Sequence, residues 1–364
     1  MRFLSLVVYI FILFAFLISC EHHHQPSTPD DPSFNSYDAN SMIPIDSAYG
    51  LKIEICRWKQ NKRAAYSITF DDVRSSHYLI SAPELNQRQM VGTFFLNTKS
   101  ITNWLPWQTL ANQGHELASH TYSHPKCPEL TEEALRFELS KAKKDILSNI
   151  HGIEDVPSFA FPYGLSNLFA REIVMEYHES ARGSWGINNA ILTKDDFSLL
   201  KYIGVYPPYD TVYVYDKIIK AIQGGKWVIF AFHSVSAEEI SDETTMPLSL
   251  FKQHLDYVQQ NIDSLWIATH GQVVSYIKVR QSATLSTSLL HNKMIEITLM
   301  DSCGFYDARK EISYQLEVPL SWRGKKLVRQ RENSSTSESL KTRNNKIVDE
   351  ICVGSTIRIF CVNE

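Results

Sequence analysis

Two adjacent carboxylates, Asp71 and Asp72, follow directly after the apolar run Ala64–Phe70. The run has the composition of a β-strand, in which consecutive side chains point to opposite faces. Where a strand ends in a loop, both carboxylates can turn toward one site, so that one ligates a metal ion and the other accepts a proton. An exposed turn that contains two aspartates is the alternative interpretation of this pair.

His120 and His124 form a second candidate group, four residues apart in the sequence HTYSH. One turn of helix would place both imidazoles on the same side of the chain. Borderline divalent metals favour imidazole ligands together with one carboxylate, and a catalytic site leaves coordination positions open for water and substrate. The pair therefore indicates a metal site, although histidines with this spacing also occur by chance on ordinary protein surfaces.

His233 follows the apolar run Trp227–Phe232, which has the composition of a fully buried strand. A histidine at the end of such a strand can act as a general acid, because its unperturbed pKa lies close to neutral pH. A histidine that is hydrogen-bonded within the core is the alternative.

Strands and helices must alternate to bring these residues together, and the sequence between residues 64 and 280 has this pattern. The clearest helix is Thr131–Ile150, in which Thr131 can cap the first turn and apolar residues recur every three or four positions. The alternation predicts parallel strand pairing in a wound or barrel-like α/β body. Further strands are expected over Gly92–Leu96, His115–Ser119, Phe159–Phe161 and Leu265–Ala268, and further helices over Phe251–Ile262 and Gly271–Val279.

In this order, and each at the end of a predicted strand, these motifs resemble those of the polysaccharide deacetylase family. This family is also described as the chitooligosaccharide deacetylase homology domain or carbohydrate esterase family 4. The resemblance covers about residues 60 to 280, and HTYSH is its most specific motif. The matching segments are TFDD at 69–72, HTYSH at 120–124, FPYG at 161–164 and FHSV at 232–235.

The resemblance implies a distorted (β/α) barrel and a bound divalent ion, zinc first and cobalt, nickel or manganese as alternatives. It assigns the metal ligands to Asp72, His120 and His124. It makes Asp71 the general base that takes a proton from the attacking water. His233 would protonate the departing amine or alcohol, and Tyr163 or its backbone N–H would help to hold the oxyanion.

The sequence departs from the family pattern at two places. The third motif of the family carries an arginine where this chain has Ala160, and the fourth motif, Asp-x-x-Asp-Trp, is not found. The missing arginine would orient the base carboxylate. We expect Arg182, near the end of the next strand, to contact Asp71 in its place; a surface arginine is the alternative.

The first residues of the chain resemble a lipoprotein signal. Arg2 precedes an apolar run that ends in Leu-Ile-Ser-Cys at Cys20, and residues 1–19 read as a signal peptide. We therefore expect an exported protein, lipid-anchored through Cys20 to the bacterial cell envelope at the outer membrane or cell surface; an uncleaved membrane helix is the alternative. Residues 20–45 read as a flexible tether, in which three adjacent histidines, 22 to 24, are more simply incidental than metal-binding.

The remaining chain is expected to form a catalytic domain over 46–281 and an accessory domain over 282–364. The latter has short alternating runs and predicts a small all-β sandwich. Its segment Arg323–Arg331 has five basic residues in nine, which indicate a solvated hairpin or a site for an anionic polymer. Trp322 beside it could stack on a sugar or pack in the core.

The sequence as a whole predicts a metal-dependent hydrolase that removes acetyl groups from a polysaccharide. N-acetyl amides lead as substrates, with O-acetyl esters second. The net charge of −4 gives no general reason to bind nucleic acid. The rival interpretation is a non-catalytic, surface-tethered glycan-binding protein on a decayed barrel, motivated by Ala160 and the absent fourth motif.

Overall fold

The computed structural model describes residues 51–206, 208–237, 242–290, 293–301, 310–332 and 334–362. The expected signal peptide (1–19), the lipidation site Cys20 and the tether (20–45) lie outside these residues, as does Cys303. Within the described part of the chain, no helix has the length and apolar character needed to cross a membrane. The four cysteines described, Cys56, Cys127, Cys352 and Cys361, are free thiols.

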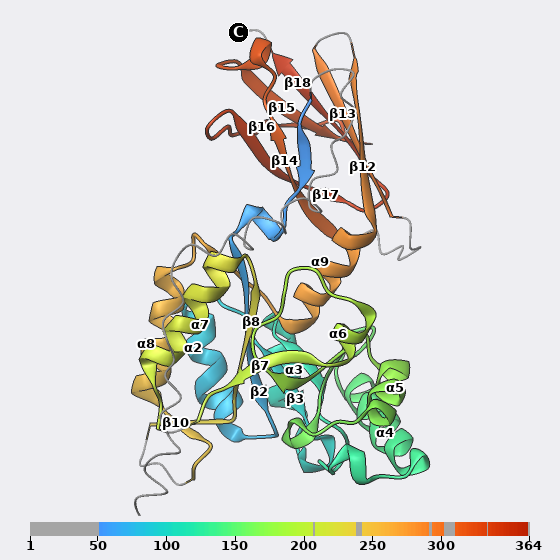
Figure 1. The fold of residues 1–364 in the computed structure, drawn as a ribbon, viewed down its shortest axis with the longest axis vertical. Helices are drawn as coiled ribbons and strands as arrows, with labels where there is room; N and C mark the ends of the chain where they lie inside the picture. The colour runs from blue at the N-terminus through green and yellow to red at the C-terminus, as the bar shows by residue number, and fades with distance from the viewer. Residues whose placement is uncertain are drawn as a thin grey trace, which may run out of the picture. The chain divides into compact units, whose positions relative to one another are not determined.

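Seven parallel strands close into a barrel (Figure 1). Closure occurs at the first strand, which pairs with both the second and the last, while β11 (Leu265–Ile267) pairs with the beginning of the first strand, at residues 64–66. The predicted α/β barrel is thus confirmed. The barrel strands are β2 (Ala64–Asp71), β3 (Thr93–Leu96), β4 (Glu116–Ser119), β5 (Ser158–Ala160), β6 (Ser180–Trp185), β7 (Leu200–Gly204) and β8 (Trp227–Phe232).

Helices connect these strands and cover the barrel, as parallel pairing requires (Figure 1). The helix predicted over Thr131–Ile150 is present as α4 (Glu132–Asn149). The Thr131 hydroxyl accepts a hydrogen bond from the Ala134 N–H and so caps its first turn. The other helices are α2 (Ala82–Gln87), α3 (Leu105–Asn112), α5 (Leu168–Tyr177), α6 (Lys194–Ser198), α7 (Thr211–Gly224), α8 (Leu248–Gln260) and α9 (His270–Ser282).

The strand β2 is buried along its whole length because both of its faces are covered. Phe70 on one face stacks on Phe94, with ring centroids 4.9 Å apart, and belongs to the large cluster between barrel and helices. On the other face, Thr69 and Asp71 point into the barrel, because side chains alternate along a strand. Burial of both faces explains why these strands read as continuous apolar runs rather than as alternating patterns.

The C-terminal strands form two antiparallel sheets, as predicted for a sandwich. One sheet has the order β12-β13-β18-β15-β16 and the other the order β1-β14-β17. Trp322 is buried, so it packs in the core rather than presenting a free face to a sugar. The strands are β12 (Ala283–Leu290), β13 (Met294–Asp301), β14 (Glu311–Glu317), β15 (Lys326–Arg331), β16 (Ser337–Leu340), β17 (Lys346–Cys352) and β18 (Thr356–Val362).

One strand of the sandwich comes from the other end of the chain. β1 (Ile53–Ile55) pairs antiparallel with β14, and Ile53 lies opposite Leu316. The one-turn helix η3 (Lys59–Asn61) then leads from β1 toward β2, and its Gln60 N–H donates to the Ser313 hydroxyl. Residues 53–55, which the sequence places with the barrel, therefore complete a sheet of the sandwich.

Candidate metal centre and active site

Asp72 and the two histidines lie together where the barrel strands end. Asp72 follows β2 with a φ of 73°, and His120 follows β4. The expected helical turn between the histidines is wrong, because His120–His124 is a loop with φ of 67° at Thr121 and 64° at His124. Such angles are rare for a β-branched residue and are typical of strained functional sites. A hydrogen bond of 2.9 Å from the His124 N–H to the Thr121 hydroxyl holds the turn.

The three side chains present donor atoms to one point. The Nε2 atoms of His120 and His124 are 3.1 Å apart, and Asp72 Oδ1 lies 4.0 Å from the former and 3.4 Å from the latter. All three ligand atoms lie within 4.8 Å of one another. Atoms bound tetrahedrally at about 2.0–2.1 Å lie roughly 3.3–3.5 Å apart. The donor set and its spacing therefore fit a zinc-type divalent ion.

The protonation of His120 suits metal binding. Its Nδ1 lies 2.8 Å from the carbonyl oxygen of Ala160. A carbonyl only accepts, so Nδ1 carries the proton and the lone pair is on Nε2, toward Asp72 and His124. Burial lowers the pKa of His120 to about 4, against the opposing effect of Asp71, so the ring is neutral at pH 7. Burial likewise lowers the pKa of His124.

Asp71 and Arg182 form a buried ion pair beside this centre, as the sequence analysis predicts. A terminal nitrogen of Arg182 donates to Asp71 Oδ1, and the two residues are only 1% and 6% exposed. Burial by itself raises the pKa of Asp71, but Arg182, His120 and His233 together lower it below its ordinary value. Asp71 is therefore an ionised carboxylate with a fixed orientation.

The guanidinium of Arg182 is held between two aromatic rings. Its central carbon lies 4.5 Å from the centroid of Phe95 and 4.8 Å from that of Tyr202. Stacking of this kind favours the planar guanidinium over an ammonium. Arg182 lies within β6 rather than at its end, in register with Ala160 on β5, which corrects its predicted place in the strand.

His233 follows β8 and faces the same centre, as its position in the sequence suggests. Its carbonyl oxygen accepts a hydrogen bond of 2.8 Å from His77 Nε2. Its ring lies 5.6 Å from that of Tyr206, and its Nδ1 is buried without a hydrogen-bond partner in the described structure. No carboxylate therefore orients this imidazole through Nδ1 among the described residues, which agrees with the missing fourth motif.

Tyr163 lies at the rim of the centre. It has a φ of 58° in the one-turn helix η7 (Pro162–Gly164), and 62% of its surface is exposed. Its ring lies 4.6 Å from the ring of His124. The side chain thus covers one face of a predicted metal ligand and remains open to solvent.

Two residues of the site were not predicted from the sequence. Arg74, two positions after Asp72, lies 3.2 Å from Asp72 Oδ2. Tyr206 follows β7 and covers His233, and burial raises its pKa to about 12, with Tyr202 and Asp71 contributing. A Cβ on Gly204 would lie 2.4 Å from the Tyr206 ring, so a glycine is needed there. Nothing in the sequence around Tyr206 marks it, because its role depends on how the chain folds back over Gly204.

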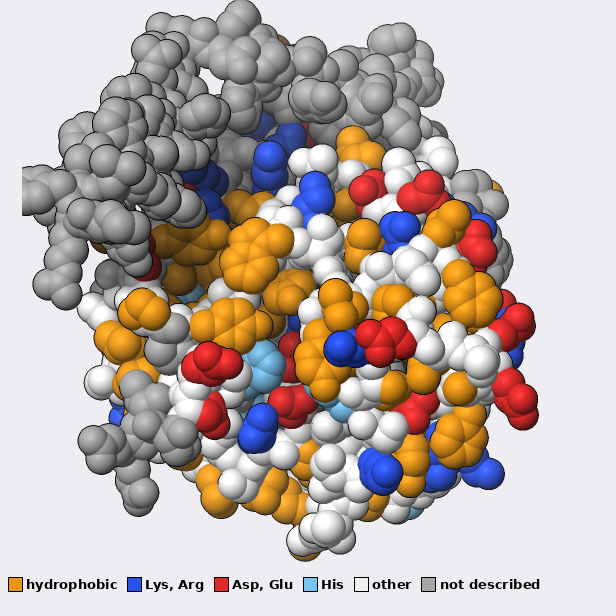
Figure 2. All heavy atoms as spheres, turned by 60° about the horizontal axis from the view of Figure 1, so that its bottom comes forward, with side chains coloured by type: hydrophobic (Ala, Val, Ile, Leu, Met, Phe, Trp, Pro, Cys, Tyr) orange, Lys and Arg blue, Asp and Glu red, His pale blue; other side chains and the backbone are white. Residues whose placement is uncertain are grey.

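The polar centre lies in a hollow of the surface. Figure 2 shows histidine and acidic side chains gathered there, surrounded by hydrophobic side chains. Two exposed aromatic residues contact the histidines of the site: Tyr163, which is 62% exposed, lies against His124, and Tyr206, which is 38% exposed, lies against His233. A substrate that reaches the centre therefore meets both charged groups and apolar surface.

Comparison with known proteins agrees with this geometry. Residues 59–178 match the polysaccharide deacetylase family. The chain contains a polysaccharide deacetylase domain. The matched segment includes Asp71, Asp72, His120 and His124, and the closed barrel that carries it is the fold expected from the resemblance.

Curated relatives of this deacetylase domain come from Bacillus. A gellan lyase of a Bacillus species is 24% identical over 270 residues, which is 68% of this chain and 11% of the relative. A peptidoglycan-N-acetylglucosamine deacetylase of Bacillus cereus is 32% identical over 107 residues, which is 28% of this chain and 37% of the relative. The chain thus matches only a minor part of either protein.

Among solved structures, the Xyl-CE4 domain of a multidomain xylanase is similar to the barrel. It comes from the hindgut metagenome of Trinervitermes trinervoides. The two chains are 18% identical, with a TM-score of 0.40 over 58% of this chain and 89% of that one.

Proposed function

We propose that this protein is a metal-dependent hydrolase that removes acetyl groups from a polysaccharide. The observation that carries the proposal is the convergence of a three-residue metal site with a buried, arginine-paired carboxylate. A site that served structure alone would have no use for an ionised carboxylate held beside the ligands. The deacetylase family match supports the choice of substrate class.

Asp72, His120 and His124 would hold the divalent ion, with zinc the first choice for two imidazoles and one carboxylate. When bound, such an ion supplies a Lewis acid that polarises a carbonyl group and lowers the pKa of water. Ala160 assists by fixing the tautomer of His120 through its carbonyl oxygen. Arg74 holds the second oxygen of Asp72, which leaves Oδ1 directed at the histidines.

Asp71 would act as the general base that accepts a proton from the attacking water. Its lowered pKa keeps it ionised, and its contact with Arg182 leaves it one fixed direction in which to accept. A general base that is already oriented raises the reaction rate, because no further orientational freedom has to be lost to reach the transition state. Arg182 is thus a positioning residue for Asp71.

His233 would donate a proton to the departing amine or alcohol. Its backbone is held by His77 and its ring lies beside that of Tyr206, so it has a defined place although no carboxylate pairs with Nδ1. Protonation of the leaving group matters most for an amide, because an amine anion is a poor leaving group. Tyr163, at the rim, would contribute to holding the oxyanion through its side chain or backbone N–H.

N-acetyl amides of glucosamine-type chains are the first choice of substrate, and O-acetyl esters the second. The name of the Bacillus cereus relative, a peptidoglycan-N-acetylglucosamine deacetylase, favours the amide. The same groups would serve an ester, since attack on the carbonyl is common to both. We further propose that the chain is exported and lipid-anchored through Cys20 at the cell envelope, where such polymers occur.

A non-catalytic glycan-binding protein is the second candidate. The observation in its favour is His233 Nδ1, which is buried without a partner in the described structure. A decayed enzyme would lose ligands without consequence, whereas here the ligands and the arginine-paired base occur together. Bound metal and released acetate distinguish the two candidates.

The test is acetate release from a panel of acetylated glycans with the whole chain. The panel holds chitooligosaccharides, peptidoglycan and acetylated xylan, each with chelator, without chelator, and with zinc restored. The proposal requires release from at least one glycan that chelator abolishes and zinc restores. Glycan binding without release under any of these conditions would establish the non-catalytic candidate instead.

A further inference from the structure

A second groove, lined mainly by the sandwich and by η3, carries a concentration of positive charge. Its volume is about 580 Å³. Four of its lining residues are basic, Lys62, Lys341, Arg343 and Lys346, and one, Asp263, is acidic. None of these residues belongs to the metal centre or its surroundings, so the proposed hydrolysis gives them no role.

Three of the four cations lack a carboxylate partner. Among the described residues, no acidic side chain lies within ion-pair distance of Lys341, Arg343 or Lys346, and all three are exposed. Lys62 is used differently, because its ammonium group donates to the Ile262 carbonyl oxygen at 2.9 Å. The groove therefore holds positive charge that no carboxylate of the described residues pairs with.

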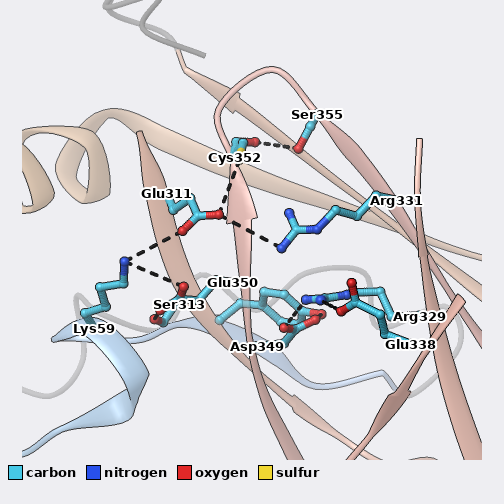
Figure 3. Close-up of polar contacts among 11 residues, drawn as sticks. Lys59, Glu311, Ser313, Arg329, Arg331, Glu338, Asp349, Glu350, Cys352 and Ser355 are labelled. Carbon is cyan, nitrogen blue, oxygen red and sulfur yellow. Dashed lines mark hydrogen bonds and ion pairs between the residues drawn. The ribbon is translucent and has the colours of Figure 1, made fainter. Parts of the chain in front are cut away.

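The three arginines of the basic run Arg323–Arg331 are paired with carboxylates, and Arg323 lies 3.2 Å from Glu317, whereas Lys325 and Lys326 are exposed. Figure 3 shows Arg329 between Asp349 and Glu338; its ion pair with Asp349 is largely buried, whereas the side chain of Glu338 is 62% exposed. Arg331 lies 4.0 Å from Glu311, which Lys59 also approaches at 3.7 Å (Figure 3). The arginines of this segment are thus engaged within the sandwich, and its two exposed lysines, Lys325 and Lys326, are not among the residues that line the groove.

A rigid turn positions two of the free cations. Arg343 and Lys346 exchange both backbone hydrogen bonds, at 2.9 and 3.0 Å, so their side chains lie on the same face. Asn344 and Asn345 between them have φ of 52° and 59°, the signature of a type I′ turn. The Val318 N–H donates to the Asn345 carbonyl oxygen at 2.8 Å and fixes the turn to the sheet. The two side chains therefore start next to each other on the same face of a fixed turn.

Neutral amides complete the groove. Asn61 Nδ2 donates to Gln315 Oε1 at 2.9 Å, and Gln60 lies beside them in the lining. Amide groups can donate hydrogen bonds to hydroxyl groups and accept hydrogen bonds from them, whereas the cations favour carboxylate or phosphate groups. The combination matches a polymer of sugars that carries negative charges.

We propose that this groove binds an acidic polysaccharide through its carboxylate or phosphate groups. The deacetylase domain in the same chain makes a glycan the fitting occupant. Nucleic acid and anionic bilayers are the other polyanions that exposed cations can attract, and the test includes both. The proposal does not depend on hydrolysis, since it concerns other residues and a binding step alone.

The test measures binding of the whole chain to two acidic polysaccharides, polygalacturonate and phosphorylated dextran, and to neutral dextran, anionic vesicles and nucleic acid. The variant is Arg343→Gln with Lys346→Gln, and the matched control is Lys325→Gln with Lys326→Gln, two exposed cations of the sandwich outside the groove. We expect one or both acidic polymers to bind and dextran to fail. The groove variant should weaken that binding at least about tenfold and the control should not, because charge-assisted hydrogen bonds are lost only in the groove.

Thermal unfolding of both variants serves as the folding control, and binding in rising salt tests the electrostatic origin, since screening should weaken it. The polymer that binds more tightly identifies the charged group. The proposal is overturned if dextran binds equally, if the groove variant binds like the wild type, or if both variants lose binding alike. Binding to anionic vesicles or to nucleic acid, but to neither acidic polysaccharide, also overturns it.

Discussion

Arg182 on β6 lies in register with Ala160 on β5, and its guanidinium reaches Asp71 on β2. Side chains at paired positions of neighbouring parallel strands lie on the same face of the sheet. Arg182 on β6 therefore points into the barrel as a side chain at position 160 on β5 does. The small side chain of Ala160 borders this space, and Phe95 and Tyr202 hold the guanidinium in it. Arg182 on the adjacent strand is therefore placed to orient Asp71, the role that the resemblance assigns to the third-motif arginine.

We predict that Arg182→Ala lowers the turnover number by roughly 10², because misplacement of a catalytic group by about 1 Å costs that much. Arg182→Lys should rescue poorly, since an ammonium cannot stack between two rings and keep the same contact. Metal content should stay at the wild-type level in both variants. Steady-state acetate release with parallel metal analysis checks this, and wild-type turnover in Arg182→Ala would contradict it.

Removal of Arg182 should also lower stability. A buried carboxylate left without its partner costs on the order of 3–5 kcal/mol. Urea unfolding of Arg182→Ala measures this loss. The double variant Arg182→Ala with Asp71→Asn should recover part of it, because the uncompensated charge is then gone.

Asp71→Asn should abolish most turnover while metal remains bound. The amide keeps the shape of the carboxylate but cannot accept the proton, and loss of a general base typically costs about 10²–10⁴ in rate. Metal analysis of the same preparation separates this effect from ligand loss. Near-normal turnover with metal bound would show that another residue is the base.

His120→Ala and His124→Ala should each remove most of the bound metal. Each substitution deletes one of three ligand atoms, and Asp72 with a single imidazole leaves an incomplete set. His151→Ala is the matched control, because His151 is an exposed histidine in no candidate metal cluster of the described residues. Unchanged metal content in both ligand variants would refute the assignment.

Cys20→Ser should release the protein from the membrane fraction. The prediction rests on the apolar run that ends in Leu-Ile-Ser-Cys at Cys20. Fractionation of cells that express each form measures the release, and mass spectrometry of the wild type detects the lipid. Unchanged membrane retention together with an unlipidated wild type would favour an uncleaved membrane helix.

Strand ends were the most predictable part of the site. Asp71, Asp72 and His233 adjoin buried apolar runs, and the carboxyl ends of parallel strands meet at one end of a barrel, so their proximity follows from the sequence. The contact between Arg182 and Asp71 could be expected because consecutive strands are usually neighbours. The position of Arg182 within its strand could not, since β6 has no long apolar run.

Other features depend on contacts that local patterns do not encode. The positive φ angles at Thr121 and His124 contradict residue preference and are set by the fold around the site. β1 pairs with β14, which lies more than 250 residues away in the sequence, and no local periodicity identifies so distant a partner. Tyr206 reaches His233 only because Gly204 leaves room for its ring.

The most direct test of the proposed function is a zinc titration of the metal-free chain with acetate release as the readout. The account predicts that release from an N-acetylated glycan rises with added zinc and levels off at one equivalent, while His120→Ala stays inactive throughout. Undiminished release by the metal-free chain, or no release from any acetylated glycan with one equivalent bound, would contradict it.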